Sequence, residues 1–192
     1  MAPLSAVMKR GRGSCIVLCR HFASSAACER IAAAMTLGSA TPSEIVADGM
    51  RVDVGVRRSF DIEVDAGTLQ YLADLLAPAS AMVERELGLA GLTFEGPGCL
   101  QYPPGAFYRP HRDVMPAAAG AEWPRRISLV LFVTGGPADG VEGGELRLHH
   151  AAGGWRDVVP ERGTLVAFPA GMIHEVRPVR AGLRQTVVDW LS

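Results

Sequence analysis

The chain has 192 residues, of which 48% are hydrophobic and 20% charged, and its formal net charge is −1 at pH 7. This length and composition predict one soluble globular domain, residues 1–192, with enough chain to bury a core. The 19 basic and 20 acidic residues are interspersed, which argues against a nucleic-acid partner bound through bulk charge. No apolar run is long enough to span a membrane, and Met1–Arg20 lacks the apolar segment of a signal peptide. We therefore expect a cytoplasmic protein with no membrane partner.

The chain begins with an extended pattern and then a helical one. The apolar run Cys15–Phe22 is typical of a strand. Ser24-Ser25 is a candidate N-cap for an alanine-rich helix over Ala26–Met35, because a serine hydroxyl accepts from the free backbone N–H groups of the first turn.

Two further segments complete the first half. Arg51–Val64 alternates apolar and polar residues, which predicts extended structure with Val52 and Val54 on one face. Leu69–Leu87 has a helical period interrupted near Pro78, which predicts one broken helix or two packed helices. We expect residues 1–96 to support the remainder of the chain.

From residue 97 the pattern changes to short apolar segments separated by Gly and Pro. Eight candidate strands follow: Gly98–Pro103, Phe107–Asp113, Arg125–Thr134, Gly144–His150, Trp155–Pro160, Thr164–Pro169, His174–Arg180 and Leu183–Leu191. Strands at this spacing are typical of a β-sandwich or barrel, and eight is the number of a jelly roll. We predict a mainly β, jelly-roll-like core over residues 97–192, with N-terminal helices covering one of its sheets.

A candidate metal site lies in this second half. Side chains at positions i and i+2 of a strand share a face, so His111 and Asp113 point the same way. An isolated His-x-Asp is more often a surface pair, but His174 begins a later strand and supplies a third ligand. Two imidazoles and one carboxylate on one face of an ion form the arrangement of non-haem Fe(II) oxygenases, which leaves positions open for other ligands.

A candidate anion site lies further along the chain. A hairpin after His174 would return Arg184 to the vicinity of the metal, with Thr186 and Trp190 on the same face of its strand. A buried guanidinium requires an anion, and the distal carboxylate of a metal-bound dicarboxylic 2-oxo acid would match it. Thr186 and Tyr102 would add hydroxyl groups to the same pocket.

The region from about Gly98 to Ser192 resembles the catalytic domain of the 2-oxoglutarate- and Fe(II)-dependent dioxygenases, in their prolyl-4-hydroxylase-like branch. The matching motifs are Gln101–Tyr108, His111-Arg-Asp113, Arg126–Val133, Gly143–Leu146, Gly163–Pro169, His174–Val179, Gly182-Leu-Arg184 and Trp190. Each motif is short, but their order and spacing agree over half of the chain. The resemblance implies a double-stranded β-helix, the jelly-roll or cupin-like fold.

The resemblance also implies roles for individual residues. His111, Asp113 and His174 would bind Fe(II), and Arg184 would anchor 2-oxoglutarate, with Tyr102 and Thr186 in the cofactor pocket. Four further residues would lie near the substrate, namely Tyr108, Arg125, Arg126 and Trp190. Arg57-Arg58-Ser59 also resembles a family feature that precedes the helices. O2 would be a second cosubstrate, with ascorbate as a candidate reductant.

One position departs from the family pattern. Some relatives carry a Tyr in the strand after Arg125-Arg126 that bonds the distal carboxylate, whereas Phe132 occupies the corresponding position here. Thr186 or Tyr102 must then supply that hydrogen bond.

The sequence leaves the substrate and the oligomeric state open. The first alternative is hydroxylation of a prolyl or other residue in a peptide or protein, with recognition by the loops Met115–Pro124 and Gly135–Gly143. The second is hydroxylation of a free amino acid or a small natural-product intermediate. The third is a non-catalytic β-barrel that binds a ligand or has a structural role, which the intact set of metal and anion residues argues against. Nucleic-acid demethylation is disfavoured by the balanced charge.

Overall fold

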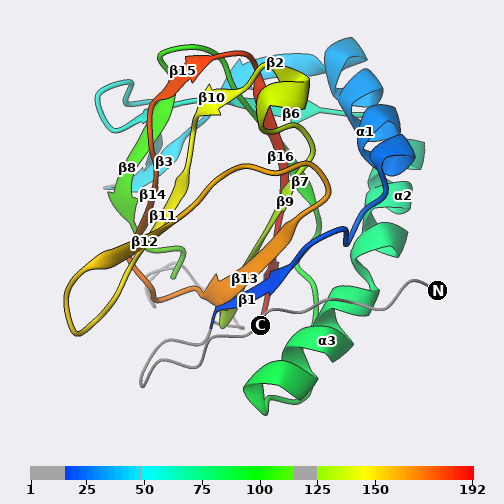
Figure 1. The fold of residues 1–192 in the computed structure, drawn as a ribbon, viewed down its shortest axis with the longest axis vertical. Coiled ribbons are helices and arrows are strands. Elements are labelled where there is room, and N and C mark those ends of the chain that lie inside the picture. The colour runs from blue at the N-terminus through cyan, green and yellow to red at the C-terminus, as the bar shows by residue number, and fades with distance from the viewer. Residues whose placement is uncertain (1–15, 48, 115–124) are drawn as a thin grey trace.

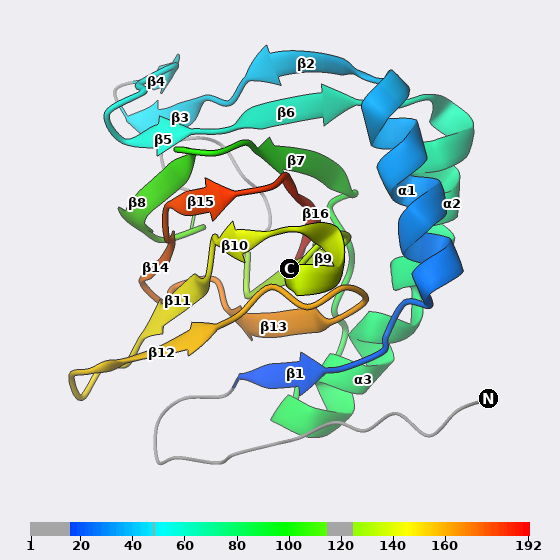
Figure 2. The ribbon, with the colours of Figure 1, turned by 45° about the horizontal axis from the view of Figure 1, so that its top comes forward.

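The computed structural model describes residues 16–47, 49–114 and 125–192. Two β-sheets face each other, and helices cover the outer side of the larger sheet (Figures 1 and 2). The loop Met115–Pro124 and Cys15 lie outside the described residues.

The larger sheet combines strands from both halves of the sequence. In spatial order its seven strands are β1 (Val17–Cys19), β13 (Leu165–Pro169), β9 (Ile127–Phe132), β16 (Arg184–Leu191), β7 (Gly98–Tyr102), β6 (Phe60–Glu63) and β2 (Ser39–Pro42). Every pairing within it is antiparallel. The helix-facing side chains of the central strand β16 are all buried, and its other side faces the smaller sheet.

The smaller sheet carries the two predicted histidines. Its five strands are β12 (Trp155–Val158), β11 (Leu146–His149), β14 (His174–Val176), β8 (Phe107–His111) and β5 (Arg57–Arg58). Two short antiparallel pairs form separate two-stranded sheets, β10 (Glu142–Gly143) with β15 (Val179–Ala181), and β3 (Ile45–Ala47) with β4 (Gly49–Arg51).

Three helices pack on the larger sheet. They are α1 (Ser25–Leu37), α2 (Ala66–Leu76) and α3 (Pro78–Leu87). Ser24 caps α1 by accepting from the backbone N–H of Ala27, as the sequence predicts. Pro78 begins α3, so the Leu69–Leu87 pattern is two helices.

Two apolar regions fill the molecule on either side of the larger sheet. The first lies between the helices and the sheet and includes Ile31, Leu72, Leu129 and Val187. The second lies between the two sheets and includes residues such as Phe132 and Phe168. A β-sandwich with helices covering the outer face of the larger sheet is the double-stranded β-helix arrangement that the sequence predicts.

Two segments differ from the sequence prediction. The alternation in Arg51–Val64 does not form one continuous face, because residues 52–56 turn and leave Val52 49% and Val54 58% exposed. The carboxylate of Asp53 accepts from the Gly55 N–H and its carbonyl accepts from Val56 and Arg57, which fixes this turn. The segment His174–Arg180 is two strands, β14 and β15, separated at Arg177-Pro178.

The segment Gly135–Gly143, predicted as a loop, contains a 3-10 helix over Pro137–Asp139. Asp139 accepts from the Gly135 N–H at 2.8 Å and pairs with Arg162. The segment is therefore tied to the turn between β12 and β13.

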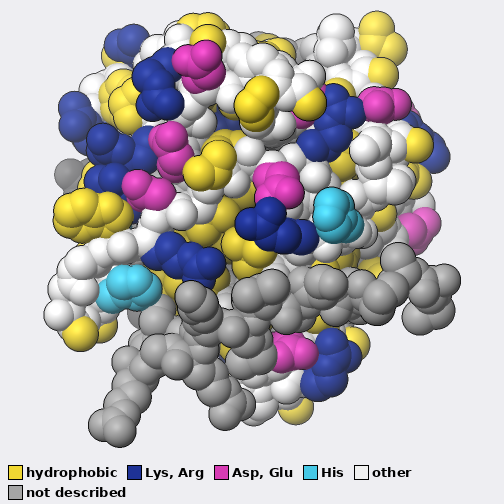
Figure 3. All heavy atoms as spheres, viewed as in Figure 1, with side chains coloured by type: hydrophobic (Ala, Val, Ile, Leu, Met, Phe, Trp, Pro, Cys, Tyr) yellow, Lys and Arg dark blue, Asp and Glu magenta, His cyan; other side chains and the backbone are white. Residues whose placement is uncertain are grey.

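The surface agrees with the balanced composition. On the face shown in Figure 3, basic, acidic and apolar side chains are interspersed. None of the helices in the described ranges is long and apolar enough to cross a membrane.

Candidate metal centre

Two neighbouring strands bring His111 and His174 together. His111 ends β8, His174 begins β14, and the two residues are directly opposite each other in the antiparallel ladder. Asp113 lies two residues after His111, where its backbone N–H donates to the Ala170 carbonyl at 2.9 Å. The chain therefore keeps its extended course past the end of β8, and Asp113 points to the same side as His111.

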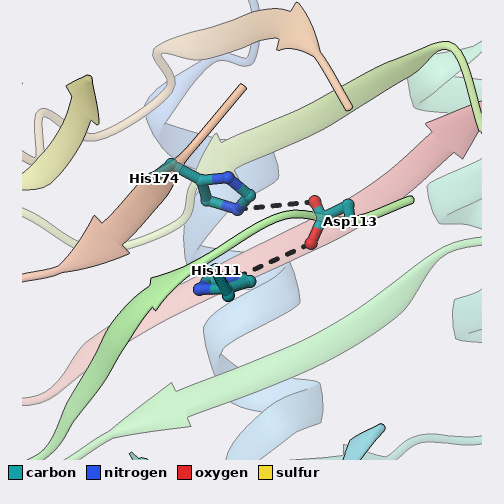
Figure 4. Close-up of side chains that lie close together, drawn as sticks. All are labelled: His111, Asp113 and His174. Atoms are coloured by element: carbon teal, nitrogen blue, oxygen red, sulfur yellow. Dashed lines mark ion pairs between the residues drawn. The ribbon is translucent and has the colours of Figure 1, made fainter. Parts of the chain in front are cut away.

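The three side chains converge on one point (Figure 4). The Asp113 carboxylate lies between the imidazoles, with Oδ1 3.6 Å from His111 Nε2 and Oδ2 3.5 Å from His174 Nε2. One ligand atom from each residue lies within 4.8 Å of the others, and the described residues contain no other such group. The sequence prediction that these three residues meet is confirmed.

Both imidazoles are oriented by the backbone. His111 Nδ1–H donates to the Arg109 carbonyl at 2.8 Å, and His174 Nδ1–H donates to the Met172 carbonyl at 3.0 Å. A carbonyl only accepts, so each Nδ1 carries the proton and each Nε2 presents a lone pair to the centre. This is the tautomer that a metal ligand requires.

Two donors hold the second oxygen of Asp113. Ser128 Oγ–H donates to Oδ2 at 2.6 Å, and the Trp190 indole N–H donates to the same oxygen at 3.0 Å. Ser128 and Trp190 are opposite each other in the β9–β16 ladder, so the two donors arrive side by side. Oδ1 accepts no hydrogen bond from the described residues and remains available as a ligand.

The protonation states suit a divalent metal. Burial, together with the nearby His174, lowers the pKa of His111 to about 3, against the opposing effect of Asp113. Burial alone would raise the pKa of Asp113, but His174, His111 and the bonds from Ser128 and Trp190 hold it below its usual range. At neutral pH His111 is neutral and Asp113 is ionised. Two imidazole nitrogens and one carboxylate oxygen form the donor set that fits Fe(II) with open positions.

Aromatic rings enclose the histidines. Tyr108 stacks on His111 with ring centroids 3.5 Å apart and planes inclined by 16°, and Phe168 meets His174 edge-on at 4.7 Å. The Arg57 guanidinium lies 4.8 Å from the centre of the Tyr108 ring, and Arg57 donates to Ser59 Oγ at 2.8 Å. The Arg57-Arg58-Ser59 segment thus reaches the metal centre through Tyr108.

Arg184 is the largest fully buried side chain among the described residues, with 1% exposure. Its Nε donates to the Gly144 carbonyl at 2.8 Å and one terminal nitrogen lies 3.5 Å from Thr186 Oγ1. The guanidinium lies 4.9 Å from the centre of the Tyr102 ring and 5.2 Å from that of Phe132. The residues predicted to surround the anion therefore lie together.

This guanidinium has no carboxylate partner within salt-bridge distance in the described part of the chain. Burial lowers the pKa of Arg184 to about 10, because the protein interior disfavours the charged form. Gly144 has φ +67, and a Cβ there would lie 2.6 Å from Arg184 Cδ. The close approach of backbone and guanidinium therefore depends on glycine. An anion entering between the sheets would compensate the Arg184 charge.

The residues predicted to lie near the substrate differ in their surroundings. Arg125 stacks over the Trp190 ring at 3.6 Å and pairs with Glu95, whereas Arg126 is exposed and donates to the Ala90 carbonyl at 3.3 Å. The indole N–H of Trp190 is used by Asp113. Their contact with a substrate stays a prediction.

The sequence did not single out Ser128, Gly144 or Glu95. Ser128 could have been found from the sequence, since a single polar residue within the apolar strand Ile127–Phe132 indicates a buried hydrogen bond. Gly144 lies within the family-like motif Gly143–Leu146, but its contact with Arg184, 40 residues away, was not predicted, and Glu95 had no signal because its partner is 30 residues away.

The model of the 2OG-Fe(II) oxygenase superfamily matches residues 97–192, half of the chain. The chain belongs to this superfamily. Its name contains the two groups, 2-oxoglutarate and Fe(II), that the His111–Asp113–His174 cluster and buried Arg184 fit.

Within the superfamily, the chain is similar to PKHD-type hydroxylases. The chain is similar to a PKHD-type hydroxylase of Stenotrophomonas maltophilia (strain R551-3), 35% identical over 94 residues, covering 48% of this chain and 40% of the relative. It is 36% identical over 102 residues to a PKHD-type hydroxylase of Klebsiella pneumoniae (strain 342), covering 52% of this chain and 44% of that protein. The chain thus spans less than half the length of these curated relatives.

Solved structures match almost the whole chain. A Pseudomonas putida prolyl-4-hydroxylase superposes with a TM-score of 0.69 at 29% identity, covering 93% of this chain and 92% of that one. The viral collagen prolyl hydroxylase from Paramecium Bursaria Chlorella virus-1, in its 2OG complex, gives a TM-score of 0.71 at 17% identity, covering 93% and 96%. The double-stranded β-helix fold is confirmed.

Proposed function

We propose that this protein is a 2-oxoglutarate-dependent dioxygenase that hydroxylates an unactivated C–H bond. One observation carries the proposal. The space between the sheets holds both a His–Asp–His cluster and a fully buried guanidinium that has no counter-ion among residues 16–47, 49–114 and 125–192. A ligand that chelates a metal at one end and carries a carboxylate at the other satisfies both.

In this proposal His111 Nε2, Asp113 Oδ1 and His174 Nε2 hold Fe(II). Arg184 pairs with the distal carboxylate of 2-oxoglutarate, and Thr186 and Tyr102 complete the pocket. The bound iron supplies the activation of O2 that couples oxidation of 2-oxoglutarate to oxidation of the substrate. The protein orients the metal and 2-oxoglutarate, and the rings of Phe132 and Phe168, with the apolar residues packed around them, exclude water.

We further propose that the substrate is a prolyl or other residue of a peptide or protein. The names of the PKHD-type relatives and of the Pseudomonas putida prolyl-4-hydroxylase, at 29% identity, support a hydroxylase of this kind. Tyr108, Trp190 and an arginine of the Arg125-Arg126 pair would then border the substrate. A free amino acid or small natural product is the second candidate, because the superfamily's metal and cosubstrate residues do not set substrate size.

The proposal is tested by incubating purified protein with Fe(II), 2-oxoglutarate and ascorbate. A panel of prolyl peptides, candidate proteins and free amino acids serves as substrate. Succinate release and a mass gain of one oxygen atom in one class of substrate are expected. His174→Ala, which removes a metal ligand, is expected to abolish both. Arg180→Ala, an exposed residue of β15, is the matched control and is expected to retain them.

Three outcomes separate the alternatives. Oxidised peptide identifies the first substrate class, and oxidised amino acid identifies the second. Absence of succinate under every condition, with metal and 2-oxoglutarate bound, would contradict an enzymatic role and favour a binding or structural module.

A further inference from the structure

We infer that Glu95, Arg125 and Trp190 form a positioning chain that fixes the Asp113 carboxylate as a ligand through one oxygen. The inference rests on the proposed metal site. It gives Arg125 and Trp190 a role separate from substrate contact, and it gives a residue from the first half of the sequence, Glu95, an indirect part in the metal centre.

The chain ends at Asp113 Oδ2. Trp190 N–H donates to this oxygen at 3.0 Å, beside the bond from Ser128 at 2.6 Å. Two donors on Oδ2 leave Oδ1 as the oxygen with free lone pairs. A carboxylate held in this way binds through one oxygen and so occupies a single position on the metal, leaving the others for cosubstrate and O2.

Arg125 fixes the indole that makes this bond. Its guanidinium carbon lies 3.6 Å from the centre of the Trp190 ring. A cation at this distance is attracted to the ring face, and it draws electron density from the indole, which makes the N–H a stronger donor. Arg125 is 20% exposed, so water screens this attraction only in part.

Glu95 in turn fixes Arg125. Arg125 Nε–H is shared between the two carboxylate oxygens of Glu95, at 2.9 and 3.1 Å. This pair keeps the guanidinium over the Trp190 ring rather than extended into solvent. The charge of Glu95 also compensates that of Arg125 next to a metal centre, where a second uncompensated cation would oppose metal binding.

The backbone places Glu95 beside Trp190. The segment before β7 runs along the end of β16, where the Glu95 N–H donates to the Trp190 carbonyl at 3.0 Å. Thr93 and Ser192 exchange two further backbone bonds, each 3.1 Å long. The Gly96 N–H donates to Asp189 Oδ1 at 3.0 Å. Glu95 is therefore held at a fixed distance from the indole by main-chain bonds on both sides.

A positioning role and a substrate role predict different measurements. If Trp190 and Arg125 only contact substrate, their substitution raises the KM for substrate and leaves metal affinity unchanged. If they position Asp113, metal affinity falls in the absence of any substrate or 2-oxoglutarate. The second measurement needs no knowledge of the substrate.

The experiment measures Co(II) affinity of the full chain by competition with a chromophoric chelator. Trp190→Phe keeps an aromatic ring for Arg125 but removes the N–H, and we expect a loss of roughly 10- to 100-fold, as for other groups that orient a metal ligand. Arg125→Met and Glu95→Gln leave the indole in place, and we expect smaller losses of about 2- to 5-fold. Arg126→Met, which removes an adjacent exposed charge, is the matched control and should bind Co(II) as the wild type does.

A double variant tests whether the residues act in series. Because Arg125 acts through the indole N–H, Trp190→Phe with Arg125→Met should bind Co(II) no more weakly than Trp190→Phe alone. Independent losses that multiply would contradict the chain. Thermal unfolding of each metal-free variant verifies that it is folded, and Ser128→Ala, which removes the other donor to Oδ2, provides a second route if Trp190→Phe does not fold.

The results distinguish this inference from the proposed function. Wild-type affinity in a folded Trp190→Phe variant, or, if that variant is unfolded, in Ser128→Ala, overturns the inference whether or not the protein produces succinate. Reduced affinity supports it even if no substrate is found. A wild-type protein that does not bind Co(II) overturns both, because it removes the metal centre itself.

Discussion

Substitution of Arg184 tests the anion site most directly. The guanidinium is 1% exposed, and its polar contacts among the described residues are the Gly144 carbonyl and the Thr186 hydroxyl. Most of its N–H donors are therefore free for a ligand. Arg184→Gln removes the charge and the planar pair of donors that fits a carboxylate.

The expected loss follows from burial. Removing one partner of a buried, hydrogen-bonded charge pair costs about 2–5 kcal/mol, which is roughly 30- to 5,000-fold in affinity. The upper part of this range applies where no water reaches the pair, as the complete burial of Arg184 indicates. Arg184→Lys keeps a charge but loses the fork, so we expect a loss between those of wild type and Arg184→Gln.

Isothermal titration of 2-oxoglutarate into Co(II)-loaded protein measures the 2-oxoglutarate affinity of the wild type and of each Arg184 variant. Co(II) affinity itself should be equal in all variants, since Arg184 lies away from the ligands. Arg180→Gln, on an exposed side chain of β15, is the control for loss of positive charge near the site. Unchanged 2-oxoglutarate affinity in a folded Arg184→Gln variant would refute the reasoning that this guanidinium awaits the cosubstrate carboxylate.

Three further predictions concern the pocket and its surroundings. The pKa of His111 is about 3 in the folded protein and near 6.5 in the unfolded chain, so the unfolded state binds the proton first as the pH falls. The unfolding free energy of metal-free protein should therefore decrease as the pH falls from about 6.5 to about 3, by at most about 1.4 kcal/mol per pH unit. Denaturant titrations at several pH values should show a smaller pH dependence of the unfolding free energy in His111→Gln than in the wild type. An equal pH dependence in the two proteins would contradict the prediction. Gly144→Ala places a Cβ 2.6 Å from Arg184 Cδ, so weaker 2-oxoglutarate binding at unchanged Co(II) affinity is expected by titration. Burial raises the pKa of Cys99 to about 11, and a Cys99-specific adduct should appear by mass spectrometry only after unfolding; labelling of native protein would show that this thiol is accessible.

Local sequence patterns were enough to predict the strands of the second half. The spacing of apolar segments indicated most of them, although His174–Arg180 is two strands and the short strand β10 was not predicted, and the i, i+2 relation placed His111 and Asp113 on one side. The helical period and Pro78 located two helices. These features depend on residues close in the chain, so periodicity carries them.

Contacts that depend on which strands pair could not be predicted from local sequence patterns. Ser128 and Trp190 reach Asp113 side by side only because β9 lies next to β16 in one particular register. The turn at Asp53–Arg57 was missed because its apolar residues alternate as in a strand, while one carboxylate and Gly55 decide the local backbone. Glu95 illustrates the same limit, since its partner Arg125 comes from another part of the fold.

The strand β16 carries Arg184, Thr186 and Trp190 on a single inward-facing row. A slip of one residue in its pairing with β7 and β9 would turn all three outward together. The anion anchor and the support of the metal ligand therefore cannot be lost separately by misregistration. In such a slipped register the proposed metal centre would lose the Trp190 donor at the same time as the proposed cosubstrate pocket loses Arg184.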